Sequence, residues 1–176
     1  IVGLMPTYGR VSRKGVMPLS WTLDHVGPMT RTVEDAALML HAISGFDPAD
    51  KTTSTESVSD FRSELSPDIK GLKIGILEDS FVDIHPDIEE AMERSIKVFE
   101  ALGAQLCPVR IPNYRVLHIA NSIIYLVEAF NNFGTRLRED SSKLGKIFRI
   151  YGYMGGLFSA DEYVQAMRLR SRTRVE

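Results

Sequence analysis

The pattern that most constrains the fold is a strand, a helix and a strand in succession in the middle of the chain. The apolar run GLKIGILED (71–79) is typical of a buried strand ending in an acidic turn. The next stretch, HPDIEEAMERSIKVFEALGA (85–104), predicts a helix with Pro86 in its first turn and Gly103 past its end. AQLCPVRIP (104–112) then predicts a second strand. This spacing is typical of a βαβ unit, in which a right-handed crossover joins two parallel strands.

Helical patterns flank this unit on both sides. TRTVEDAALMLHAISGF (30–46) has Thr32 as an N-cap and Asp35 three residues later, which is a capping-box pattern. Ser159 and Glu162 repeat that pattern near the C-terminus. Three helices are predicted after the βαβ unit, over residues 114–137, 145–156 and 159–176. Helices mixed with strands in this way indicate the α/β class.

Composition narrows the functional classes. Hydrophobic residues make up 44% and charged residues 25% of 176 residues, which is typical of a globular domain with a real core. The formal net charge of -2 favours neither nucleic acid nor an anionic membrane as a partner. A single cysteine, Cys107, excludes an internal disulfide framework, and its apolar strand predicts a buried, inert thiol. We find no signal peptide and no membrane-spanning run, and we expect a cytoplasmic protein.

The residues alone do not form a complete catalytic set. Ser12 and Lys14 suggest a serine–lysine pair, but VSRKG is typical of a polar turn, and a base lysine must be buried to lose its proton. Asp24 and Asp35 could act as a general acid and base, but capping and turn hydrogen bonds explain both. No phosphate loop is present. No metal site is predicted, because the histidines lie far apart, at His25, His41, His85 and His118.

Arginines are concentrated near the C-terminus, at Arg168, Arg170, Arg172 and Arg174. A nucleic-acid patch is one interpretation. Alternate residues of a helix point well apart, however, so the four do not form one tight cluster. A solvated helix end is favoured, and direct nucleic-acid binding is not expected.

A long run of motifs resembles the amidase signature family. GLMPTYGRVSRKGVMPLSWTLDHVGPMTRTVEDAALMLHAISGFDPAD (3–50) is similar to that family's G-L-K-P-T-x-G-R-V-S segment, its S-L-D-x-x-G-P-M-T-R-T-V-E-D-A-A segment and its G-x-D-P-x-D loop. Met5 stands where the family usually has lysine, at a position outside the family's catalytic set. Further on, GLKIGILED, YLVEAF and ADEYVQAMRLRSRT resemble the family's next strand, its E-A helix and its Y-x-x-A-x-x-x-R helix.

The resemblance implies a portion of the amidase-signature fold, a mixed sheet flanked by helices that includes the βαβ unit. We expect residues 1–176 to be a single partial domain. Within it, 1–50 lie close to the signature segment, 51–70 form an exposed connector, and 71–176 hold the βαβ unit and the helices.

The implied chemistry is hydrolysis of amide carbon–nitrogen bonds by a serine, a cis-serine and a lysine, without cofactor or metal. In the family these groups precede the G-L-K-P-T segment, so no catalytic residue is expected in this chain. The apolar start at Ile1 and a last helix without a stop signal favour the middle portion of a longer amidase. The chain alone is therefore predicted to be inactive, with exposed apolar surface along Ile1–Leu4.

The resemblance also suggests site residues. Asp24 and Arg31 are expected to support the catalytic loop, with a structural role favoured. Arg170 matches the arginine of the Y-x-x-A-x-x-x-R helix, which in the amidotransferase A-subunit branch resembles a clamp for the glutamine carboxylate. A planar guanidinium suits that task. The alternative is that Arg170 is one more surface arginine.

Three functional hypotheses remain. The leading one is part of an amidase-signature hydrolase, whose partners are a small-molecule amide substrate and the remainder of the amidase chain. The second is part of the glutaminase (A) subunit of a tRNA-dependent amidotransferase, which would require partner subunits. The third is a non-catalytic α/β interaction module. None of them involves a membrane.

Overall fold

The computed structural model describes residues 1–66, 68–77 and 84–173. The chain divides into two compact units, and each is considered by itself. The first unit comprises Ile1–Glu64 and Leu117–Glu176, and the second comprises Leu65–Val116. The organisation as one partial domain, expected from the sequence, stays a prediction.

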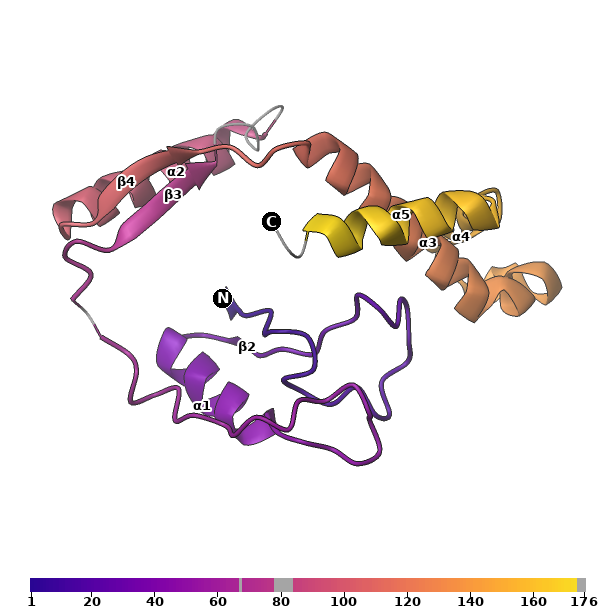
Figure 1. Ribbon diagram of the computed structural model, residues 1–176, viewed down its shortest axis with the longest axis horizontal. Helices are drawn as coiled ribbons and strands as arrows, with labels where there is room; N and C mark the ends of the chain where they lie inside the picture. The colour runs from indigo at the N-terminus through magenta and orange to yellow at the C-terminus, as the bar shows by residue number, and fades with distance from the viewer. Residues whose placement is uncertain (67, 78–83, 174–176) are drawn as a thin grey trace. The chain divides into compact units, whose positions relative to one another are not determined.

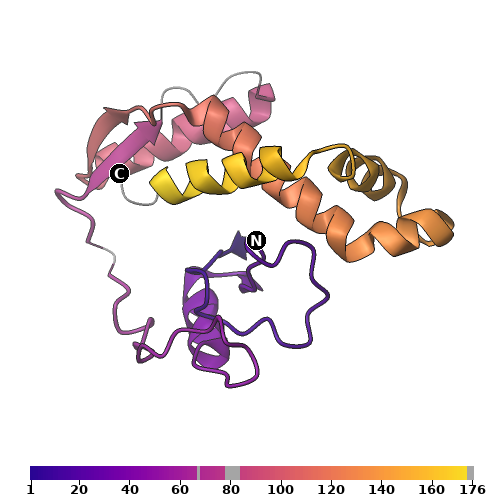
Figure 2. The same ribbon diagram turned by 45° about the vertical axis from the view of Figure 1, so that its right-hand side comes forward.

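The second unit contains the predicted βαβ arrangement. Strand β3 (Lys73–Leu77) pairs in parallel with β4 (Gln105–Val109), and α2 (Pro86–Ala101) connects them. Figures 1 and 2 both show α2 running alongside the two strands. The prediction of parallel strands around a helix is confirmed.

The ends of α2 follow from local chemistry. The His85 side chain accepts a hydrogen bond from the Asp87 backbone N–H at 3.3 Å, and Pro86 occupies the first helical position. Gly103 has a φ of 85°, a left-handed conformation that glycine adopts without strain. These signals act within a few residues, which is why the sequence pattern located the helix correctly.

The burial predicted for this unit is wrong. Ile74, Ile76 and Leu77 are only partly buried in β3, and Cys107 in β4 is exposed. Within the described part of the unit the sheet has two strands beside a single helix, so apolar side chains on the strands keep contact with solvent. The acidic end of the predicted strand, residues 78–79, lies outside the described residues.

The N-terminal part of the first unit is a short antiparallel pair followed by a helix. Strand β1 (Val2–Gly3) pairs with β2 (Met29–Thr30), and α1 (Val33–Ile43) follows. The Thr32 hydroxyl accepts a hydrogen bond from the Asp35 N–H at 3.1 Å, which confirms the predicted N-cap. Helix α1 buries three residues, Ala36, Ala37 and Leu40. Ile1, by contrast, is 95% exposed.

The predicted C-terminal helices are also present in this unit. They are α3 (Tyr114–Glu139), α4 (Lys146–Gly155) and α5 (Ala160–Thr173), with a short 3₁₀ helix, η1 (Ser141–Lys143), between α3 and α4. Ala120 and Ile124 on α3 and Ala166 on α5 form a buried cluster. Ala166 has a small side chain, which permits close packing of the two helices.

Two glycines allow α4 to approach α3 closely. A β-carbon at Gly152 would lie 2.7 Å from a methyl group of Leu137, and one at Gly155 would collide with the Leu126 carbonyl oxygen. Gly152 and Gly155 are themselves buried. The absence of side chains at these positions therefore makes this helix contact possible.

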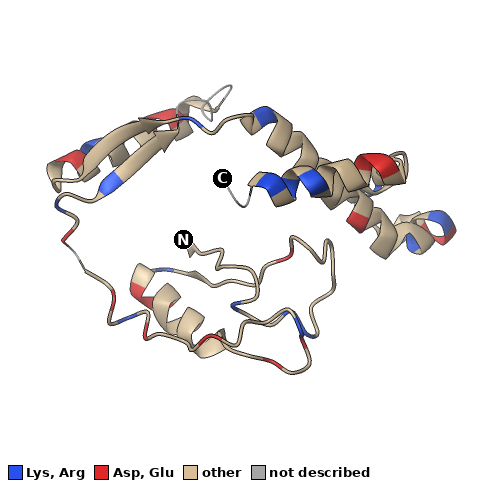
Figure 3. Ribbon diagram, in the orientation of Figure 1, with Lys and Arg blue, Asp and Glu red and all other residues tan. Residues whose placement is uncertain are grey.

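Helix α5 begins at the capping box predicted from the sequence. The Glu162 N–H donates to the Ser159 hydroxyl at 3.2 Å, and the Glu162 carboxylate accepts from the Ser159 N–H at 2.7 Å. Figure 3 shows acidic residues at the start of α5 and basic residues towards its end, which complements the helix dipole.

Within the described residues, no helix is both long enough and apolar enough to cross a membrane.

Candidate functional site

A buried carboxylate on α3 is the centre of a polar network in the first unit. Glu128 is 3% exposed. One of its oxygens, Oε2, accepts hydrogen bonds from the Ser20 hydroxyl at 2.6 Å and the Thr22 N–H at 3.1 Å. The other, Oε1, accepts from the hydroxyls of Thr22 and Tyr163, each at 2.8 Å. Both oxygens are thus satisfied, as burial of a carboxylate requires.

The segment from Leu19 to Asp24 is shaped by a second carboxylate. Asp24 accepts hydrogen bonds from the backbone N–H groups of Leu19 at 2.9 Å and Ser20 at 3.1 Å, and its own N–H donates to the Ser20 carbonyl at 2.7 Å. The Asn132 side chain on α3 donates to the Leu19 carbonyl at 3.0 Å. Backbone groups of this loop therefore have specific side-chain partners, which restrict its conformation.

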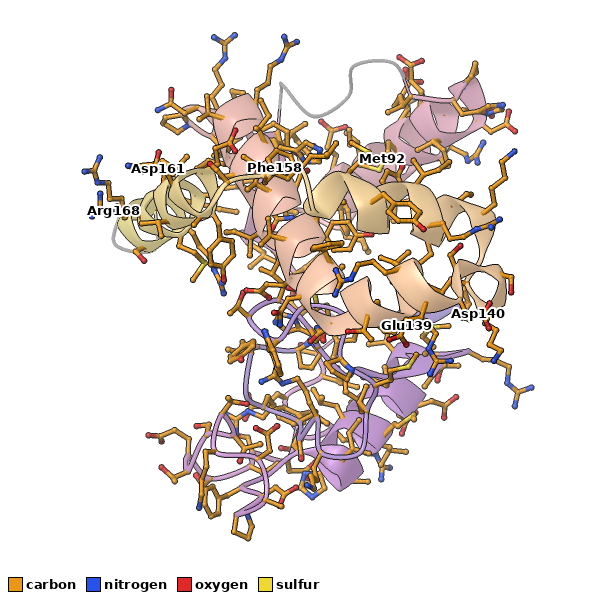
Figure 4. The ribbon with its side chains drawn as sticks, turned by 90° about the vertical axis from the view of Figure 1, so that its right-hand side faces the viewer. Met92, Glu139, Asp140, Phe158, Asp161 and Arg168 are labelled. Carbon is orange, nitrogen blue, oxygen red and sulfur yellow. The ribbon has the colours of Figure 1, made fainter. Side chains whose placement is uncertain are left out.

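Arg170 on α5 contacts the same loop. Its Nη2 donates to the Thr22 carbonyl oxygen at 2.7 Å, and its side chain is partly buried. Arg168 and Arg172, two positions away on either side, are exposed, and Figure 4 shows Arg168 directed away from α3. The prediction that these arginines form no tight cluster is confirmed for these three, while Arg174 lies outside the described residues.

A hollow of about 490 Å³ lies beside Arg170, and we call it the Arg170 hollow. Its other lining residues are Thr7, Tyr8, Thr22, His25, Met167 and Ser171. The His25 Nδ1 lies 2.6 Å from the Leu23 carbonyl oxygen, so Nδ1 is the donor of this hydrogen bond. A guanidinium, hydroxyls and an imidazole together suit a small polar ligand that carries a negative charge.

The network changes the protonation behaviour of two residues. Burial raises the pKa of Glu128, but the hydrogen bonds from Ser20, Thr22 and Tyr163 together hold that pKa below its ordinary value. Burial, followed by the hydrogen bond to Glu128, raises the pKa of Tyr163 to about 12. Both shifts favour an ionised carboxylate and a neutral phenol, the pair that forms the observed hydrogen bond.

The structure also locates the other residues singled out from the sequence. The Ser12 hydroxyl donates to Asp47 at 2.6 Å and accepts from the Lys14 N–H at 3.1 Å, while the Lys14 side chain is exposed. This is the polar turn favoured by the sequence. Arg31 is exposed and lines a shallow hollow beside Met29 and Asp35, apart from the network around Glu128. No group of three potential metal ligands occurs among the residues that the structure describes.

Glu128 is a member of the site that was not predicted from the sequence. A usable signal was present, because Glu128 follows Ala120 and Ile124 at helical spacing on the buried stripe of α3. A charged residue in such a stripe requires buried partners. Those partners could not be read from the sequence, because Ser20 lies 108 positions from Glu128.

Comparisons with known proteins agree with this architecture. The amidase family model matches residues 1–170. The A subunit of the glutamyl-tRNA(Gln) amidotransferase of Akkermansia muciniphila is 43% identical over 177 aligned positions, which cover 100% of this chain and 34% of that protein. An amidase of Pseudomonas putida is 41% identical over 172 positions, covering 97% of this chain and 37% of that protein.

A solved structure shows the same fold. The A subunit of the glutamyl-tRNA(Gln) amidotransferase of Thermotoga maritima superimposes with a TM-score of 0.74 and 32% sequence identity, over 94% of this chain and 36% of that chain. The present chain thus spans about a third of the length of the curated relatives it matches. A family match over nearly the whole chain, together with this structural likeness, establishes that the chain belongs to the amidase family.

Proposed function

We propose that this chain forms part of an enzyme that hydrolyses amide carbon–nitrogen bonds. The observation that carries the proposal is the family match over residues 1–170. Relatives that align over 97–100% of the chain are named as an amidase or as the A subunit of an amidotransferase. Both names describe chemistry at an amide, so the reaction class is common to the two.

The contribution proposed for this chain is substrate binding and support, with the bond-breaking groups supplied by other segments. All seven lysines lie in the described residues, at positions 14, 51, 70, 73, 97, 143 and 146, and each is exposed. None has the buried setting that a base lysine requires. The 176-residue chain alone is therefore expected to be inactive, and amide turnover by a preparation free of other amidases would contradict this.

Within this function, Arg170 is proposed to bind a carboxylate of the substrate. One N–H of its guanidinium is directed to the Thr22 carbonyl, and the Arg170 hollow lies beside the side chain. A guanidinium has five N–H donors, so further donors besides the one directed to Thr22 are available for a bidentate contact with a carboxylate. Asp24 is proposed to support the site by fixing the loop that carries Thr22. Arg31 is proposed to have a structural role near β2.

A carboxylate contact at Arg170 favours one specific alternative, the glutaminase (A) subunit of an amidotransferase. Glutamine carries both the amide to be cleaved and a carboxylate that an arginine can bind. The 43% identity to the A subunit from Akkermansia muciniphila supports this alternative. In that case, partner subunits would receive the ammonia released from glutamine.

Steady-state kinetics of the complete gene product test both versions. Hydrolysis of a simple primary amide and of glutamine should be measured side by side, with and without co-purifying subunits. Turnover of the simple amide by the isolated protein supports the hydrolase, whereas glutamine turnover that requires partner subunits supports the amidotransferase version. Failure to release ammonia from either substrate, alone or with those subunits, would contradict the proposal.

The proposal includes a cytoplasmic location. A single cysteine fits a reducing compartment, where disulfides are rare. Cell fractionation with an antibody against the protein tests this, and recovery outside the cytoplasmic fraction would contradict it.

A further inference from the structure

We propose that Glu128 is a positioning residue that sets the place of the Arg170 guanidinium through Thr22. This inference rests on the proposed function, in which Arg170 binds the carboxylate of the substrate. Glu128 itself has no role in contacting substrate, because its two oxygens are occupied by protein donors in a buried setting. It acts on the site through the loop that it holds.

Thr22 connects Glu128 to Arg170. The N–H and the hydroxyl of Thr22 both donate to Glu128, at 3.1 and 2.8 Å, while its carbonyl oxygen accepts from Arg170 at 2.7 Å. Two hydrogen bonds to one carboxylate fix both the position and the rotation of this residue. Rotation of Thr22 would move the carbonyl away from the guanidinium, so the Glu128 contacts determine where Arg170 finds its acceptor.

A second connection reaches α5 directly. The Tyr163 hydroxyl donates to Glu128 at 2.8 Å, and Tyr163 precedes Arg170 by seven residues on the same helix. Residues seven apart lie on nearly the same face of a helix, so Tyr163 and Arg170 both face the loop. Glu128 therefore fixes the acceptor of Arg170 and also the helix that carries it.

An ionised carboxylate suits this task because it is a pure acceptor. Four donors from three residues converge on its two oxygens. Each donor forms its hydrogen bond only when its N–H or O–H points at the carboxylate. A glutamine at this position would present an amide N–H₂ to part of the set. The amide oxygen can keep the Ser20 hydroxyl and the Thr22 N–H, while the hydroxyls of Thr22 and Tyr163 must reverse to accept from the amide N–H₂. All four hydrogen bonds also lose the negative charge that strengthens them. The substitution Glu128→Gln thus weakens the contacts that hold the loop, with little change in volume.

Kinetics of the complete enzyme test the proposal. Glu128→Gln should raise the KM for glutamine about tenfold, because the guanidinium loses its fixed place beside the carboxylate. The kcat for glutamine and both constants for butyramide, an amide without a carboxylate, should stay within about twofold. Glu139→Gln, at the exposed end of the same helix, serves as the matched control and should leave all four constants unchanged. An equal loss with both substrates, or no change, would overturn the proposal.

Two further substitutions cover the case in which Glu128→Gln fails to fold. Thr22→Ser keeps the hydroxyl that donates to Glu128, and we expect a KM for glutamine close to that of the wild type. Thr22→Val removes that donor and should raise the KM for glutamine while sparing butyramide. If Thr22→Val and Thr22→Ser behave alike, the carboxylate does not position Arg170 through this residue.

Fluorescence separates failure of this inference from failure of the proposed function. Trp21 precedes Thr22, so the part of the acrylamide quenching that a Trp21→Phe variant of the complete enzyme lacks reports on the loop without any enzymatic assay. Glu128→Gln should increase the quenching constant of Trp21 at least about twofold, and Glu139→Gln should not. Unchanged quenching overturns the positioning role even in an active enzyme. Increased quenching in a protein that hydrolyses no amide refutes the proposed function instead.

Discussion

Single carboxylates with several hydrogen bonds hold the loops of the first unit. Asp50 accepts from the Arg13 N–H at 2.8 Å and from the N–H and hydroxyl of Thr52 at 3.0 and 2.6 Å. The hydroxyl of Thr52, followed by these backbone groups, lowers the pKa of Asp50 to about 2. Asp50 is thus a residue whose ionised form the folded loop favours.

The low pKa of Asp50 predicts an acid-dependent contribution to stability. A depressed pKa in the folded state stabilises the fold above the ordinary value of 3.8, and this contribution is lost as the pH falls towards 2. The difference in unfolding free energy between the wild type and Asp50→Asn should therefore shrink from pH 5 to pH 2. Urea unfolding at several pH values measures it. A difference independent of pH would contradict the lowered pKa of Asp50. Thr52→Val removes the hydroxyl that lowers this pKa most, so the contribution to stability should then be lost at a higher pH.

Tyr163 should titrate later than an ordinary tyrosine. Its pKa of about 12 stands above the usual value of 10.0, because burial and the hydrogen bond to Glu128 disfavour the phenolate. The stability it contributes is present below pH 10 and is lost as the pH rises through 12. The absorbance difference between the wild type and Tyr163→Phe isolates this residue among six tyrosines. If this absorbance difference titrates with a midpoint near pH 10, the prediction is contradicted.

At the scale of elements, the contact between α3 and α4 depends on Gly155. An alanine there would place its β-carbon against the Leu126 carbonyl oxygen, which belongs to a helix backbone and cannot move aside. We expect Gly155→Ala to lower the unfolding free energy by about 1–3 kcal/mol, as overpacking commonly does. Gly145→Ala is the matched control, because no atom lies within 4 Å of its added carbon, and it should cost less than about 1 kcal/mol. Equal losses in chemical denaturation would refute this account.

The capping box of α5 makes a separate, local contribution. Ser159→Ala removes the acceptor for the Glu162 N–H and should cost about 1 kcal/mol of unfolding free energy. Ser159→Asp keeps an acceptor at the same place and should restore most of the loss. Thermal unfolding of the three proteins measures both effects. If the aspartate variant is as unstable as the alanine variant, the cap is not the cause.

At the scale of the whole molecule, the two units differ in how much they bury. In the second unit no described residue of β3, α2 or β4 is fully buried, whereas Ile124 and Leu137 on α3 are each 1% exposed. Backbone hydrogen bonds with little apolar cover open at low free-energy cost. We therefore expect amide hydrogens of β3 and β4 to exchange faster than those around Ile124. Native hydrogen-exchange mass spectrometry measures this, and slower exchange in the strands would contradict it.

Much of the fold was predictable because its signals are local. Thr32, Ser159 and Gly103 mark helix ends through hydrogen bonds or backbone angles that involve only a few neighbouring residues. The parallel pairing of β3 and β4 followed from the length of the helix between them. The family was identifiable for a similar reason, since its motifs are continuous in the sequence and were confirmed over residues 1–170.

The candidate site was predictable only in part. Arg170 and Asp24 were singled out by resemblance, and the structure places both at the loop that carries Thr22. Glu128 was missed, although it connects the other members. Burial of Cys107 was predicted wrongly, because an apolar strand is buried only where other elements cover it.

The sequence by itself determined the helices with their ends, the parallel strand pair and the family. These depend on hydrogen bonds and apolar spacing within short stretches of chain, or on motifs that are contiguous. Only the tertiary structure decided that Ser20 and Glu128 meet and that Cys107 remains exposed. Such contacts and burial arise from packing between residues far apart in the chain, and no local pattern specifies which distant residue packs against a given side chain.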